Sequence, residues 1–301
     1  MGSAETTNWS FAEWAKDNLE LAAATAAVKD LPAMADIVTD FLTATQDPEW
    51  TAKDLAVIIA RDPAVSASVL KVANSSYYSR QRQITSLEGA VSVLGLKALK
   101  SLVLAASMKN INKRFGLIEK LLVEDSIGGA LSARAIARQV GGLDPEEAFL
   151  AGLMRHLGKI AMNNLDPEAY REIVQGVYNQ EGTLAELERK HFPYTHSAIG
   201  AALLDSWNFS PDLVACTLFH AGQPPSGEFD ETTERLLAIV NLSGTVCQRL
   251  GIGQRQADES VLLRDNPQTE KLQLDEEAVE TILEEVSGAF EETRQAFLGG
   301  S

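Results

Sequence analysis

The chain has 301 residues and a formal net charge of −16 at pH 7, and 45% of its residues are hydrophobic while 23% are charged. This composition is typical of a folded globular protein and excludes a fibrous or disordered chain. The acidic excess repels phosphate backbones and anionic lipid head groups at long range. We therefore expect neither nucleic acid nor a membrane among its partners.

The cysteines and the apolar runs indicate a reducing, cytoplasmic location. Cys216 and Cys247 form no C-x-x-C arrangement, so the sequence predicts neither a disulfide framework nor a zinc ribbon. The longest apolar stretch, residues 90–108, is interrupted by Lys97 and Lys100. The N-terminal segment carries acidic residues where a signal peptide needs basic ones. We expect a cytoplasmic protein without a membrane span.

Helical periodicity dominates the chain and predicts an all-α fold. Thr51 with Asp54 is typical of an N-cap, and the helix that it opens should end near Arg61. Asp62–Pro63 then supplies the next cap, with a proline at the first helical position. The run Thr85 to Glu88 reads as a capping box in front of a strongly apolar helix. Short, well-capped helices of this kind predict a bundle.

A second series of helices begins near residue 116. Its predicted elements are a helix capped at 144–146 that runs into 152–159, helices over 167–180 and 183–190, helix starts at 195–196 and 210–211, a loop over 221–232, and an amphipathic helix over 275–297. The last of these carries much of the acidic excess. No fixed-period repeat or low-complexity tract interrupts the pattern.

Several segments, taken together and in order, resemble the HDOD family, the HD-related output domain of bacterial signalling proteins. They are Leu31–Pro32, RDPAVSASVLKVANSSYYS (61–79), ITSLEGAVSVLGLKALKSLVLA (84–105), GLMRHLGKI (152–160) and HSAIGAALLDSWNFSPDLVACTLFH (196–220). The resemblance implies a multi-helix bundle in which an N-terminal helical lobe packs on a degenerate HD-type lobe. It also implies a role in signal transduction.

The domain boundaries follow from the extent of this resemblance. We expect an N-terminal helical extension over residues 1–30 and an HDOD domain over 31–253. That domain divides into an N-terminal lobe (31–115) and an HD-like lobe (116–253). An acidic helical segment over 254–301 completes the chain.

The stretch Gly152 to Lys159 resembles the metal-binding turn of HD phosphohydrolases with its ligands replaced. Where the HD superfamily has an adjacent His and Asp that bind a catalytic cation, this chain has Arg155 and His156. By the same resemblance, the first family His corresponds to Asp125 and the final Asp to Gly244. A guanidinium donates no lone pair, and it repels a nearby dication by several kcal/mol even at an effective dielectric near 20. We expect no catalytic residue, no metal and no cofactor.

The predicted ligand or partner pocket is this vestigial HD site. It comprises Asp125, Arg155, His156, His196 and His220. Two alternatives stay open for these residues: the last two histidines are ordinary buried residues at helix ends, or the three histidines hold a lone noncatalytic metal. We predict that Arg155 pairs with Asp125 or another acid.

Together these features predict a non-catalytic regulatory module of bacterial signalling. Its expected partners are signalling proteins or a small ligand such as a nucleotide, bound in a groove between the lobes that the vestigial site lines in part. The alternative is a divergent HD-type phosphohydrolase that acts on a nucleotide or cyclic dinucleotide. A third possibility is a sensor that binds a nucleotide through Arg155 without cleaving it.

Overall fold

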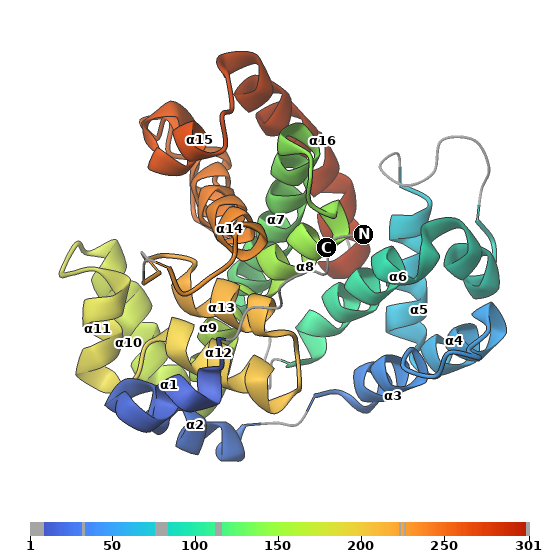
Figure 1. Cartoon of the computed structure of the whole chain (residues 1–301), viewed down its shortest axis with the longest axis horizontal. Coiled ribbons are helices and arrows are strands. Elements are labelled where there is room, and N and C mark those ends of the chain that lie inside the picture. The colour runs from blue at the N-terminus through green and yellow to red at the C-terminus, as the bar shows by residue number, and fades with distance from the viewer. Residues whose placement is uncertain are drawn as a thin grey trace.

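The computed structural model describes residues 9–31, 34–75, 84–111, 116–222, 224–225 and 227–298, and these ranges contain helices and no strands (Figure 1). The first helices are α1 (Phe11–Asp17), α2 (Leu19–Ala27), η1 (Val28–Asp30), α3 (Asp36–Ala44), α4 (Ala52–Ile59), α5 (Pro63–Ala73) and α6 (Leu87–Ile111). Next come α7 (Leu117–Val140), α8 (Pro145–Met154), α9 (Leu157–Leu165), α10 (Pro167–Tyr178), α11 (Leu184–His191), α12 (His196–Ser206) and α13 (Pro211–Phe219). The last are α14 (Glu231–Leu250), η2 (Leu263–Asp265), α15 (Pro267–Lys271) and α16 (Glu276–Leu298).

The helices form two lobes, as the resemblance implies. Figure 1 shows α3 to α6 grouped on one side of the molecule, while α7 runs through the middle of the second group. Helices α8, α14 and α16 pack on α7. Contacts of α6 with α8 and of α16 with α5 join the two lobes. The expected all-α architecture is therefore confirmed, whereas the predicted domain boundaries stay a prediction.

Most predicted caps are present as side-chain hydrogen bonds. Thr51 and Asp54 form a reciprocal capping box at the start of α4. Asp62 accepts from two backbone amides of α5, and Asp144 caps α8. Thr195 is the N-cap of α12, the helix that begins with His196. Each cap satisfies amides that a helix start would otherwise leave unpaired.

The predicted cap at 85–88 needs a correction. The amide of Gly89 donates to Ser86 Oγ at 3.1 Å, so Ser86 and not Thr85 occupies the capping position. The following helix is also not continuous, because Gly95 interrupts it at a φ of 73° that glycine adopts without strain. Residues 76–83, which include the end of the segment 61–79 that carries the resemblance, lie outside the described residues.

Helix α6 contains the one stretch, among the described residues, that is long and apolar enough to cross a membrane. This stretch, Leu87–Met108, has 56% of its most apolar window buried inside the protein. The core helix of a globular protein passes the same test, and α6 packs against α4 and α5. Its apolar character is therefore explained by burial in the N-terminal lobe. A cytoplasmic location stays a prediction.

The N-terminal extension packs on the second lobe and supports the helix that carries His196. Helices α1 and α2 contact α12, and the ring of Trp9 lies 6.4 Å from that of Phe219 at the end of α13. Glu20 of α2 accepts hydrogen bonds from the amide of Thr195 at 3.0 Å and from its Oγ1 at 2.6 Å. The start of α12 is therefore held from outside the HD-like lobe.

The acidic terminal helix α16 docks on its own chain. Glu285 pairs with Arg138 of α7 at 2.9 Å. Near the other end of α16, the carbonyl of Ala296 accepts from Ser68 Oγ of α5 at 3.1 Å. The helix thus bridges the two lobes.

Candidate functional site

Close helix contacts at glycines bring the site together. A Cβ on Gly158 of α9 would lie 1.8 Å from the carbonyl oxygen of His196 at the start of α12. A Cβ on Gly152 of α8 would likewise lie 2.3 Å from the carbonyl oxygen of Gly129 of α7. Such distances are far below van der Waals contact, so these positions require glycine. The two contacts position the turn between α8 and α9 against α7 and α12.

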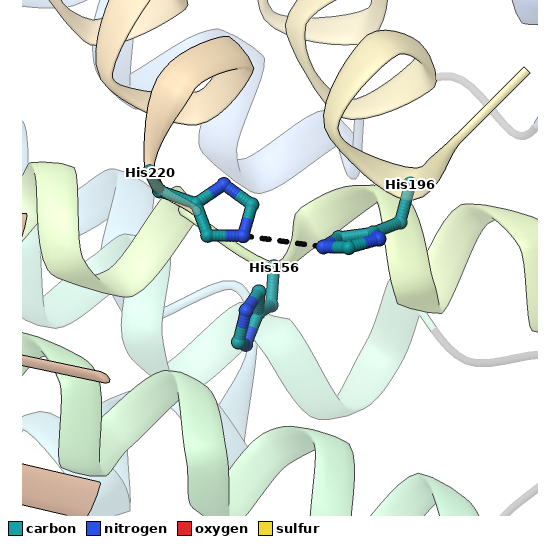
Figure 2. A group of neighbouring side chains, drawn as sticks. All are labelled: His156, His196 and His220. Carbon is teal, nitrogen blue, oxygen red and sulfur yellow. Dashed lines mark hydrogen bonds between the residues drawn. The ribbon is translucent and has the colours of Figure 1, made fainter. Parts of the chain in front are cut away.

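The five residues of the predicted pocket converge in the structure. Asp125 lies on α7, Arg155 and His156 form the turn between α8 and α9, His196 begins α12, and His220 follows α13. Figure 2 shows the rings of His196 and His220 facing each other with the ring of His156 beside them. The His156 ring centroid lies 4.7 Å from that of His220 and 5.4 Å from that of His196. The resemblance therefore identified residues that share one place in the fold.

One side of the site is an ionic cluster around Asp125. Arg155 Nη2 donates to Asp125 Oδ1 at 2.6 Å, which confirms the expected pairing with an acid. The other carboxylate oxygen contacts His156 Nδ1. Lys159 Nζ lies 3.1 Å from the same His156 nitrogen and 3.9 Å from Asp125 Oδ2. Asp125 therefore faces two cationic side chains and orients an imidazole.

The sequence leaves room for the guanidinium of Arg155 on two sides. A Cβ on Gly129 would lie 2.5 Å from Arg155 Nε, and one on Gly244 would lie 3.0 Å from Arg155 Nη1. Gly244 is the position to which the resemblance assigns the last metal-binding Asp. The loss of that side chain and the gain of Arg155 are thus spatially linked, because the arginine occupies the space beside residue 244.

The other side of the site is a row of hydrogen bonds that begins at Glu188. Both oxygens of this fully buried carboxyl lie 2.8 Å from His196 Nδ1, and the amide of His196 donates to Oε2 at 3.0 Å. His196 Nε2 lies 3.1 Å from His220 Nε2, and His220 Nδ1 donates to the carbonyl of Thr217 at 2.8 Å. The Glu188 carboxyl, the His196 ring, the His220 ring and the Thr217 carbonyl are therefore linked one after another by hydrogen bonds.

Hydrogen-bond accounting fixes the proton count of this row. His220 uses its Nδ1–H for the Thr217 carbonyl, so its Nε2 presents a lone pair to His196. His196 must then donate from Nε2, which leaves its Nδ1 to accept a hydrogen bond from the protonated carboxyl of Glu188. Burial raises the pKa of Glu188 from 4.5 to about 7, which favours that protonated form. The row is thus satisfied when Glu188 is neutral.

The histidines themselves are neutral near pH 7. Burial lowers the pKa of His156, His196 and His220 well below the usual imidazole value. The positive charges of Arg155 and Lys159 lower all three further. Unprotonated imidazoles are good metal ligands, but they are also what burial beside two cations produces without any metal.

Two members of the site were missed from the sequence. Lys159 belongs to the quoted turn but reads as an exposed helix lysine, whereas its side chain is only 16% exposed. Glu188 stands in the charged segment Leu184–His191, which is typical of a solvated helix, and yet it is completely buried. Its spacing of eight residues from His196 matches no local helix or turn pattern, so only the tertiary fold reveals the pair.

Comparison with known proteins gives the family. Residues 31–223 match the model of the HDOD domain. The chain belongs to the HDOD family. An HDOD domain protein of unknown function from Geobacter sulfurreducens has a similar structure, with 25% identity, a TM-score of 0.71, and coverage of 92% of this chain and 97% of that one.

Two further relatives widen the comparison. A Shewanella amazonensis protein, named provisionally as a phosphohydrolase, shares the fold at 22% identity and a TM-score of 0.71, over 93% of this chain and all of that one. An uncharacterized protein of Treponema pallidum is 21% identical over 217 residues, which are 72% of this chain. This HDOD chain spans 42% of the length of that relative.

The donor set of this HDOD protein does not fit the dinuclear metal centre of a hydrolase. Asp125, the carboxylate at the turn of His156, already pairs with Arg155, and Glu188 is already hydrogen-bonded to His196. Gly244 offers no donor atom. Bridging two cations requires free carboxylate oxygens, and here permanent charges compete for the available ones.

A single metal ion fits the imidazoles better. One nitrogen from each of His156, His196 and His220 lies within 4.8 Å of the others. The 3.1 Å between the Nε2 atoms of His196 and His220 is close to the ~3.3 Å between two imidazole nitrogens bound to one tetrahedral zinc. The third donor is engaged, because His156 Nε2 faces Arg155 Nη1 at 3.5 Å and Nδ1 contacts Asp125. The arrangement therefore offers the lone pair of His220 Nε2, while His196 must first move its proton from Nε2 to Nδ1 and His156 must exchange partners.

The site is nearly closed to solvent. Arg155 is 3% exposed, His220 4% and His196 5%. The open cavity between the lobes is lined by other residues, from α3, α6 and the connection between α12 and α13. In the described part of the chain, the vestigial site and the interlobe cavity are thus separate features, and the expected overlap between them is not observed.

Proposed function

We propose that this HDOD protein is a non-catalytic regulatory module of bacterial signalling that acts by binding a protein or a small ligand. The observation that carries the proposal is the buried ion pair of Arg155 with Asp125 at the turn where HD hydrolases bind metal. Hydrolysis at this turn requires a metal ion that binds a water molecule and lowers its pKa for attack on phosphorus. A guanidinium does not coordinate water in this way, so Arg155 does not replace such an ion.

The energetics favour the ion pair over a metal. Breaking a buried pair by removing one partner typically costs about 3–5 kcal/mol, because the other charge is left uncompensated. A dication entering beside His156 would have to displace Arg155 and Lys159 from Asp125, and each would then repel it.

The structural neighbour from Marinobacter aquaeolei, named provisionally as a signal transduction protein, shares this fold at 18% identity with a TM-score of 0.66.

Turnover measurements test the proposal. Protein purified without chelator is incubated with Mn²⁺ and bis(4-nitrophenyl) phosphate, nucleoside monophosphates or a cyclic dinucleotide, beside the variant His196→Ala. We expect the same background rate for both proteins. Turnover by the unchanged protein that the variant lacks would contradict the proposal.

A metal-dependent phosphohydrolase is the second candidate, and the cluster of His156, His196 and His220 favours it. It predicts stoichiometric metal by elemental analysis in addition to turnover. Stoichiometric metal without turnover would leave the regulatory proposal in place and identify the imidazole cluster as a noncatalytic metal site. The two measurements together distinguish the candidates.

A further inference from the structure

A cavity of about 540 Å³ opens between the two lobes. One wall consists of α3 and α6 of the N-terminal lobe, and the other consists of the end of α12, the connection to α13 and its first turn. Cavities of 300–1,000 Å³ are of the size that proteins use for small-molecule ligands. A ligand here would touch both lobes at once.

The charge of this cavity is opposite to that of the chain. Of the described residues that line it, two are lysines, Lys97 and Lys100, and none is acidic. Four other cavities formed by described residues each include at least one carboxylate in their lining. In a protein with a net charge of −16, an acid-free cavity with two lysines is a local site for an anion.

The two lysines differ in whether a carboxylate already pairs with their charge. Lys97 pairs with Asp144, the N-cap of α8. Lys100 has no carboxylate partner among the described residues, and its Nζ lies 5.8 Å from the ring centroid of Phe209. Burial lowers the pKa of Lys100, which shows that the protein surroundings disfavour its charge. An anion beside Lys100 would relieve this cost.

Aromatic surface lies next to this lysine. Trp207 and Phe209 both line the cavity and are partly exposed. Between them, Asn208 has a φ of 56°, a left-handed conformation that lets the chain turn sharply out of α12. On the facing wall, the side chains of Thr39 and Thr43 are exposed hydroxyl donors. Cation, aromatic faces and hydroxyls are the groups that bind a phosphate joined to a planar ring.

We propose that the interlobe cavity binds a nucleoside phosphate, with the phosphate at Lys100 and the base against Trp207 and Phe209. The inference deepens the proposed function, since it names the class of small ligand that the regulatory module takes. Bound between α3 and α12, such a ligand stabilises one arrangement of the lobes and so changes the surface offered to a partner.

Calorimetric titration of the full chain tests this. The probes are AMP and GMP. Adenosine and guanosine, which lack the phosphate, and inorganic phosphate, which lacks the base, show how much each part of the nucleotide contributes to binding. We expect each nucleotide to bind at least about tenfold more tightly than its nucleoside and than phosphate alone. Lys100→Met should weaken nucleotide binding about tenfold or more, whereas Lys53→Met, the matched control at an exposed lysine of α4 outside the cavity, should change it less than about threefold.

Three outcomes would overturn the inference. They are the absence of nucleotide binding, equal losses in the two lysine variants, and binding of a Glu-rich peptide in place of nucleotide. Circular dichroism melts establish that both variants fold. Hydrolysis of the bound nucleotide would refute the proposed function while leaving the site intact, and absence of binding would remove the site while leaving a protein partner open.

Discussion

Arg155 and Lys100 are both cations withdrawn from bulk water, and their surroundings are opposite. Arg155 is 3% exposed and has a carboxylate at 2.6 Å, with glycines on two sides that make room for it. Lys100 is half-buried beside an open cavity and has an aromatic ring in place of a carboxylate. The first cation is internally compensated and serves structure, while the second is left for an external anion. The cation at the turn that resembles the HD metal site is therefore less available to a ligand than Lys100.

The largest difference between the two cations is expected in the variant Arg155→Met. We expect it to lower the free energy of unfolding by about 3–5 kcal/mol, because the largely buried carboxylate of Asp125 loses its guanidinium partner. Urea unfolding followed by circular dichroism measures this. A change below about 1 kcal/mol would mean that the pair contributes little and that Asp125 is available to other cations.

Gly158→Ala should have the next largest effect, a loss of about 3 kcal/mol. The new Cβ would meet the carbonyl oxygen of His196 at 1.8 Å, so α9 and α12 must separate. Gly222→Ala is the control, since a Cβ there meets no atom within 4 Å, and it should change stability by less than about 0.5 kcal/mol. Equal stability of the two variants in urea would refute the close contact on which the site geometry depends.

The pH dependence of the free energy of unfolding tests the protonation state of Glu188 in the row of hydrogen bonds. The pKa of Glu188 is raised to about 7 in the folded protein, so the folded state keeps a proton that the unfolded state loses above about 4.5. Its contribution is therefore present at low pH and is lost as pH rises towards 7, with an amplitude of about 3 kcal/mol. The three histidines have lowered pKa values and act in the opposite direction, as their contribution grows with pH.

A difference measurement separates these contributions. The stability of the unchanged protein minus that of Glu188→Gln should fall between pH 5 and pH 7 and level off above it, because both proteins keep the histidines. Unfolding curves at several pH values give this difference. A difference that rises with pH would show that Glu188 is ionised in the folded state.

The smallest expected effect has the opposite sign. Lys100→Met should raise the free energy of unfolding by about 0.5 kcal/mol, since it removes a charge that burial disfavours and keeps the apolar stem. Replacement of a cation by methionine is thus expected to destabilise the protein at Arg155 and to stabilise it at Lys100. A loss of stability at Lys100 would indicate that its charge has a structural partner.

Local patterns were enough to predict most of the helices, and the family resemblance identified five members of the site. Caps such as Thr51 and Asp62 act within a few residues, so their hydrogen bonds are legible in the sequence. The break at Gly95 was missed because an isolated glycine in an apolar run is compatible with a continuous helix. The pairing of Glu188 with His196 was missed for a different reason, since it depends on how α11 meets α12.

The relation between the site and the lobes was also beyond the sequence. The resemblance located the residues that replace the metal ligands, but it carried no information on their exposure. Burial of Arg155 depends on Gly129 and Gly244, two residues on different helices that leave space from opposite directions. The interlobe cavity depends on the approach of α3 to the turn after α12, which is purely tertiary.

Anomalous X-ray scattering from crystals grown with millimolar Mn²⁺ tests the central claim most directly. The account predicts that Arg155 remains on Asp125 and that no pair of bridged ions appears beside His156. Two manganese peaks coordinated by Asp125, His156, His196 and His220, with the guanidinium turned away, would contradict it.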